Sequence, residues 1–149
     1  MSSASAPREP LVARLLRRAV LAILLFSTVG SLMELWLLGH YEDAWQFIPL
    51  GLLLLTLVVT TAYLLRPSEA RRRVFVASMC IVAASGGVGY WLHYRGNVEF
   101  ELEMYPERAG LELFRESMTG ATPVLAPGTM TVIGLLGLAA TWRPKRTSR

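Results

Sequence analysis

Residues 47–65 read FIPLGLLLLTLVVTTAYLL, a stretch without a single charged side chain. About 20 apolar residues are enough for an α-helix to cross the roughly 30 Å hydrocarbon core of a bilayer. Hydrophobic residues make up 53% of the 149-residue chain. Charged residues make up only 17%, below the roughly 25% of soluble domains. The stretch therefore predicts an integral membrane protein.

Three further apolar blocks have the same character. Residues 19–38 contain one charged residue, Glu34, and residues 74–94 contain no Lys, Arg or carboxylate. Residues 123–142 are uncharged but include a Pro-Gly pair at 127–128. We expect an all-α membrane protein, a bundle of four transmembrane helices. Its expected spans lie near residues 17–39, 46–66, 72–94 and 122–142.

The ends of the chain differ in character from the apolar blocks. Residues 1–10 are polar and rich in Ser, Ala and Pro, so we expect a disordered tail there. Residues 11–149 are then expected to form a single integral membrane domain.

The basic residues predict the orientation. Residues 8–18, the connection at 66–73 and the C-terminal residues 143–149 hold four each, 12 of the 15 Lys and Arg residues. By the positive-inside rule these segments, and so both termini, lie in the cytoplasm. Their juxtamembrane position indicates contact with anionic lipid rather than with nucleic acid. The excess of Arg over Lys is typical of GC-rich bacterial genomes, which favours the bacterial inner membrane.

The longest connection, residues 95–121, is acidic and lies on the outer side in this orientation. It begins with GNVEFELEMYPE at 96–107, where apolar and acidic residues alternate as in a β-strand. Residues 106–119 instead predict an amphipathic helix that lies in the membrane interface. Its apolar face is expected to carry Leu111, Phe114 and Met118.

The alternating segment suggests a role. On a strand, its apolar residues Phe100, Leu102 and Met104 would have to be buried against other protein. A partner could bury them, because a strand can bind the sheet edge of a partner. The chain carries no nucleophile elbow, phosphate loop or HExxH motif. We therefore expect a structural or accessory subunit and not an enzyme. Its expected partners are the lipid bilayer and a larger membrane complex or further copies of the chain.

Small residues form stripes within the blocks. Ser27, Gly30, Ser31 and Glu34 share one helical face, and the third and fourth blocks carry glycine stripes, Gly86 with Gly89 and Gly134 with Gly137. Such stripes let helices approach closely in lipid, so we expect them to face one another. A carboxylate at the depth of Glu34 is costly unless paired. The leading expectation is a structural ion pair between Glu34 and Arg95.

Two alternatives use the same outer end. A divalent metal is possible at His40, His93, Glu34 and Glu99, and the two histidines could also be axial haem ligands, although no cofactor is required by any motif. A Glu in the first of four spans also resembles the small multidrug-resistance transporters, which implies proton-coupled transport through Glu34. Those proteins have short loops throughout, whereas this chain has a long one at 95–121.

Overall fold

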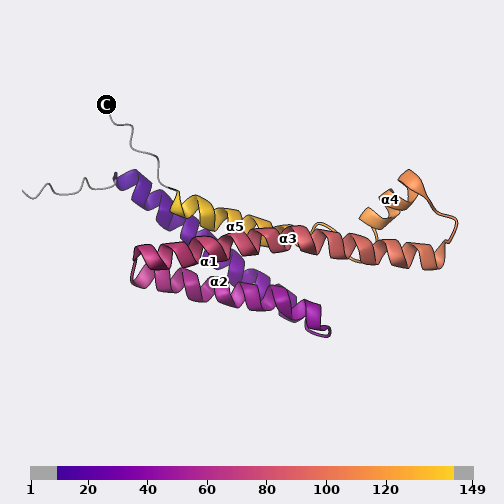
Figure 1. The fold of residues 1–149 in the computed structure, drawn as a ribbon, viewed down its shortest axis with the longest axis horizontal. Coiled ribbons are helices and arrows are strands. Elements are labelled where there is room, and N and C mark those ends of the chain that lie inside the picture. Colours follow the sequence, from indigo (N-terminus) through magenta and orange to yellow (C-terminus); the bar gives the residue numbers. More distant parts are fainter. Residues whose placement is uncertain (1–9, 143–149) are drawn as a thin grey trace, which may run out of the picture.

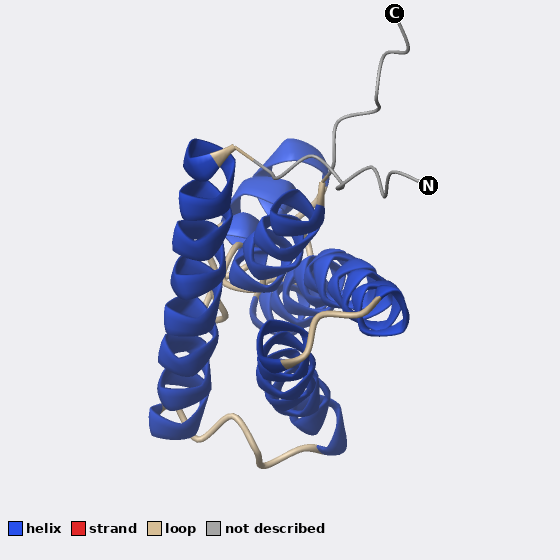
Figure 2. Cartoon of the chain, turned by 90° about the vertical axis from the view of Figure 1, so that its left-hand side faces the viewer, coloured by secondary structure: helices blue, strands red, loops and turns tan. Residues whose placement is uncertain are grey.

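The computed structural model describes residues 10–142, and every regular element in that range is a helix (Figure 2). The elements are α1 (Leu11–Leu37), the short 3₁₀ helix η1 (Ala44–Gln46), α2 (Phe47–Leu65), α3 (Glu69–Met104), α4 (Gly110–Met118) and α5 (Gly128–Thr141). The predicted N-terminal tail, apart from Pro10, and the basic residues after Trp142 lie outside this range.

Three segments are long and apolar enough to cross a membrane: α1, η1 with α2, and α3. The predicted fourth span is helical only from Gly128 onward, because Pro127 occupies the N-cap of α5. With 14 residues, α5 is about 21 Å long, shorter than a roughly 30 Å hydrocarbon core. The prediction of a multi-pass helical membrane protein is thus supported for three spans.

The prediction of a strand at the start of the outer loop is wrong, because residues 97–104 are the last two turns of α3. Glu, Leu and Met are strong helix formers, and a helix that is already formed adds residues without a new nucleation cost. The helix continues to Met104 and ends two residues before Pro106, which cannot continue it. The predicted connection 95–121 is therefore shorter and mostly helical.

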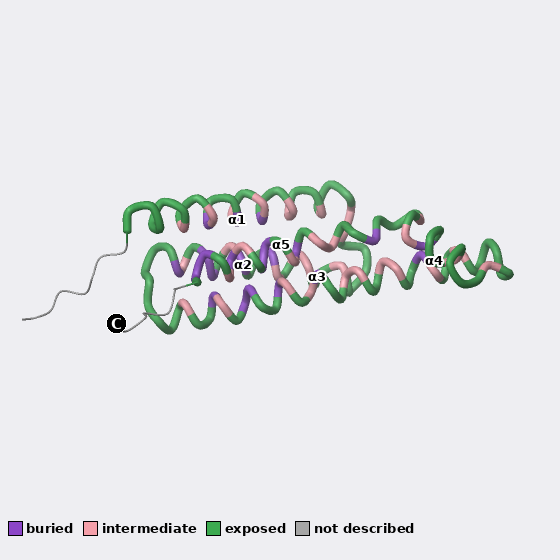
Figure 3. Tube along the Cα trace, turned by 90° about the horizontal axis from the view of Figure 1, so that it is seen from above, coloured by how far each residue is buried: buried purple, intermediate pink, exposed green. Residues whose placement is uncertain are grey.

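The helices pack in a closed order. Helix α3 contacts α2 and, most extensively, α5, while α1 contacts α2 and α5. The buried core combines residues of these four helices: Leu21, Leu24, Leu53, Val59, Tyr63, Phe75, Met79, Val82, Met130, Ile133 and Ala140. Figure 3 shows buried stretches where α2, α3 and α5 lie next to one another, while much of α1 is exposed.

Glycines make the α3–α5 contact close. A Cβ atom added to Gly134 would lie 2.5 Å from the backbone nitrogen of Ala83 and 2.6 Å from the carbonyl oxygen of Met79. Gly86 and Gly89 of α3 likewise meet Pro127 and Thr131. The predicted contact of these stripes is confirmed. Gly30 of α1 is different, since nothing lies within 4 Å of its Cβ position.

The two ends of the molecule differ in charge. The start of α1, the α2–α3 connection and the end of α5 lie at one end (Figure 1). The basic residues of these described segments, among them Arg14, Arg18 and Arg73, are thereby gathered there. At the opposite end α3 projects beyond the other helices, and α4 lies beside it (Figure 1).

The α3–α5 contact gives a first prediction. In Gly134→Ala the new methyl group meets backbone atoms that cannot move aside, so the free energy of unfolding should fall by about 1–3 kcal/mol. The matched control is Gly51→Ala, because nothing lies within 4 Å of that Cβ position. Thermal unfolding in detergent measures both. Equal stability of the two variants would contradict the close α3–α5 contact.

Candidate functional site

The projecting end is a helical hairpin, formed by residues 95–104 of α3 and by α4. Asn97 is 2% exposed and holds the returning chain against α3. Its amide nitrogen donates to the carbonyl oxygens of Ser117 (2.8 Å) and Thr122 (2.7 Å), and its oxygen accepts from the backbone N–H of Thr122 (3.0 Å). A Cβ atom at Gly120 would lie 2.8 Å from the Asn97 side chain, so the chain passes close only because Gly120 has none.

An ion-pair network fixes the tip of the hairpin. The guanidinium of Arg108 donates to the carboxylate of Glu101, and these side chains are only 21% and 12% exposed. Arg108 also lies 3.4 Å from the carboxylate of Glu112 on α4 and 3.8 Å from the ring centre of Tyr105. Paired charges that are shielded from water are screened little. The position of α4 is thus fixed at both ends of the hairpin, by the hydrogen bonds of Asn97 and by the ion pairs of Arg108.

The predicted amphipathic helix exists, but it begins at Gly110 rather than at Pro106. Its fully buried residue is Ser117, which faces α3 near Asn97. The apolar residues Leu111 and Phe114 remain exposed, at 72% and 48%. Helix α4 therefore contacts α3 through the buried Ser117 and through the ring of Phe114 against Tyr94, while Leu111 stays exposed.

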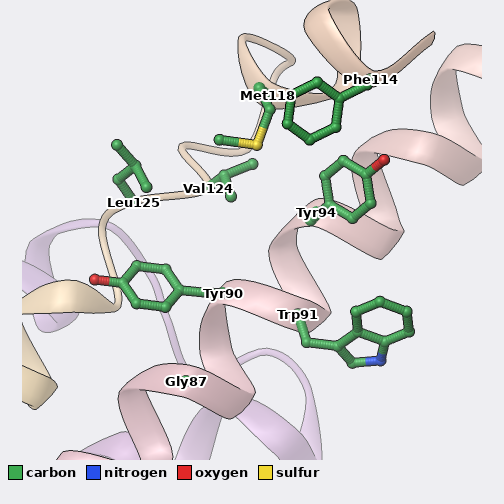
Figure 4. Close-up of a pocket in the computed structure, with 8 residues that line it drawn as sticks. All are labelled: Gly87, Tyr90, Trp91, Tyr94, Phe114, Met118, Val124 and Leu125. Atoms are coloured by element: carbon green, nitrogen blue, oxygen red, sulfur yellow. The ribbon is translucent and has the colours of Figure 1, made fainter. Parts of the chain in front are cut away.

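An apolar recess of about 390 Å³ lies where α3, α4 and the following loop meet (Figure 4). The rings of Tyr94 and Phe114 form one wall, with their centres 5.9 Å apart. The lining is aromatic and aliphatic, from Gly87, Tyr90, Trp91, Tyr94, Phe114, Met118, Val124 and Leu125. Trp91 and Leu125 are largely exposed, so the recess is open on the surface.

Helical geometry separates the three residues predicted to bind a partner. Residues two apart on an α-helix point in nearly opposite directions. Leu102 follows Trp91 at helical spacing, on the side of α3 that carries the recess, whereas Phe100 and Met104 lie together on another side. The three residues do not form one apolar face, as they would on a strand. We use the name apolar side of the hairpin for four residues of the recess beside it and two exposed leucines of the hairpin itself: Trp91, Tyr94, Phe114 and Leu125, with Leu102 and Leu111.

His40 follows the end of α1, and His93 lies on α3. His93 donates from Nδ1 to the carbonyl oxygen of Pro123 at 2.9 Å. Partial burial, and then the charge of nearby His93, lower the pKa of His40 from its ordinary value of 6.5. Within residues 10–142, however, these histidines are not joined by a third His, Cys, Asp or Glu in an arrangement that could hold a metal ion.

The predicted ion pair between Glu34 and Arg95 is not formed in the described part of the chain. Arg95 pairs instead with Glu99 at 2.8 Å, one turn further along α3, and both side chains are exposed. Glu34 is exposed on α1 and takes part in no ion pair in the described range. The sequence predicted a paired Glu34, whereas its side chain is exposed on α1.

The chain matches no protein-family model, none of the curated proteins and none of the solved structures with which it was compared. Two features of the site were missed in the sequence. Asn97 belongs to the segment that was predicted as a strand, so its role was not recognised. Because Asn is unfavourable inside a helix, its presence at this position could have indicated a specific contact. Trp91 and Tyr94 belong to the predicted third span, and their repeat at helical spacing with Val98 could have indicated that the helix continues.

The Asn97 contacts give a second prediction. Replacing Asn97 by Ala removes three hydrogen bonds and leaves backbone groups of Ser117 and Thr122 without this partner, at a cost of about 2–3 kcal/mol. Amide hydrogen exchange should accelerate over residues 110–122 and stay nearly unchanged in α2. Gly96→Ala is the control, because its Cβ position is open. Unchanged exchange at residues 110–122 in Asn97→Ala would show that the Asn97 hydrogen bonds do not hold this segment against α3.

The lowered pKa of His40 gives a third prediction. The unfolded chain binds this proton more readily than the folded protein, so the stability contributed by neutral His40 is present above pH 6.5 and lost as the pH falls below it. The unfolding temperature should decrease from about pH 7.5 to about pH 5.5. In His40→Gln the unfolding temperature should decrease less over the same pH range. If it decreases as much as in the unmodified protein, protonation of His40 is not the cause.

Proposed function

We propose that this protein is an accessory subunit of a membrane complex and that the apolar side of the hairpin docks onto a partner protein. One observation carries the proposal: the hairpin is held in place by buried polar contacts, yet its apolar side is uncovered. Exposed apolar surface that is rimmed by charged residues marks interaction sites. Because the hairpin is already ordered, little conformational entropy is lost on docking.

The orientation is part of the proposal. The termini and the α2–α3 connection are cytoplasmic, in accordance with the positive-inside rule, and the hairpin is on the outer side of a bacterial inner membrane. The short α5 completes a fourth crossing together with the apolar residues 122–127. Irregular backbone at membrane depth is tolerated where protein covers it. The hydrogen bond from His93 to the carbonyl oxygen of Pro123 supports such cover.

The other candidate functions have less support. Metal binding would need further ligands beside His40 and His93, supplied by water or a partner. Proton-coupled transport through Glu34 would need a path within the protein, whereas Glu34 lies on the exposed side of α1. Docking through the hairpin uses residues that are already in position.

The proposal predicts which side of the hairpin matters. Leu102→Lys and Leu111→Lys place a charge on the apolar side and should lower the recovery of the complex about tenfold or more after mild detergent extraction. Phe100→Lys is the matched control, because it adds the same charge to another side of the same helix. Quantitative mass spectrometry of material purified through a tag on this chain measures the recovery.

Two results would oppose this proposal. Equal losses in Phe100→Lys and Leu102→Lys would indicate a general effect of charge, and recovery of the unmodified chain only as a monomer would remove the accessory role. Thermal unfolding of each variant serves as the folding control, since all three side chains are exposed and their replacement should cost little stability.

A further inference from the structure

Glu34 is an exposed carboxylate on the surface of a membrane-spanning helix. It lies one turn before the end of α1. Exposed apolar residues flank it along the helix: Phe26 lies toward the middle, and Leu37 and Leu38 lie toward the end. Leu37 and Leu38 are 80% and 72% exposed. Glu34 is therefore surrounded by the part of α1 that would face lipid.

A carboxylate in this position is unfavourable without a partner. Charged side chains within the hydrocarbon are rare, and they normally face protein or a water-filled space and pair with an opposite charge. The short Glu side chain has to pass a full turn of exposed apolar residues to reach the outer head groups. No hydrogen bond or ion pair of its carboxylate occurs within residues 10–142, so the compensating group must come from outside the described chain.

We propose that the exposed side of α1 around Glu34 binds a transmembrane helix of another protein, and that this helix carries an Arg or Lys at the depth of Glu34. Gly30 lies one turn away on the same side, and nothing is within 4 Å of its Cβ position, so a second helix can approach closely there. The structure favours α1 for this contact, because α1 is the least buried of the three candidate spans.

Charge argues against a second copy of this chain as the occupant. A two-fold symmetric contact between two α1 helices repeats the same surface on both sides. It would bring two Glu34 carboxylates together at one depth, where they repel. A partner with a basic residue satisfies the carboxylate and also explains its place on the outside. The inference rests on the proposed role in a larger assembly but uses a surface separate from the hairpin.

Two synthetic transmembrane peptides test the inference. Both are built of Leu and Ala; one carries a single Arg one turn below its outer end, and the other carries Leu there. The full-length protein is labelled at Cys80, its only cysteine, which is exposed. Energy transfer between protein and peptide in liposomes measures association. The Arg peptide should bind roughly 5- to 30-fold more tightly than the Leu peptide.

The variants decide the origin of any difference. Glu34→Gln should reduce the preference for the Arg peptide strongly, and Glu34→Leu should abolish it, whereas Glu42→Gln, outside the helices, should retain it. Equal binding of both peptides, or a preference that survives Glu34→Leu, would overturn the inference. Association between differently labelled copies of the protein that depends on Glu34 would overturn it too. None of these results depends on the hairpin. The proposal that the hairpin docks onto a partner is therefore tested independently, by the Lys variants described above.

Discussion

Helix α3 is longer than the membrane is thick, and the outer half of the structure depends on this. Its 36 residues extend about 54 Å, against a hydrocarbon core of roughly 30 Å, so about 16 residues lie outside the core. Because α3 is a single uninterrupted helix, the hairpin is rigidly connected to the candidate membrane span of α3. The residues 95–104 of the hairpin are therefore carried on a continuous helix rather than on a loop.

The buried polar groups explain how this projection stays ordered. A nine-residue helix such as α4 is too short to be stable alone in water. Its place is set by the hydrogen bonds of Asn97 at one end and by the ion pairs of Arg108 at the other. These contacts use polar atoms on the inward side of the hairpin. The apolar atoms of α4 are consequently left for the outside, where the recess begins.

The sequence predicted the position and residue spacing of single helices better than it predicted which side of each helix contacts the rest of the protein. Three of the four apolar blocks and the glycine stripes of α3 and α5 follow from length and spacing, and the structure supports them. The alternation at Val98–Met104 was misread, because a short alternating pattern also suits a helix that exposes two sides. The direction of Glu34 was misread for a similar reason. Helical spacing gives a face, but only packing shows whether that face meets protein or lipid.

The central claim, that α3 continues without interruption beyond the membrane, is tested most directly by Cα chemical shifts of residues 95–104. The measurement uses isotope-labelled full-length protein in lipid nanodiscs. We predict helical shifts at every position from Arg95 to Met104, followed by a break at Tyr105. Extended shifts across Val98–Met104 would instead show the strand that the sequence suggested. That result would contradict the hairpin and the docking surface built on it.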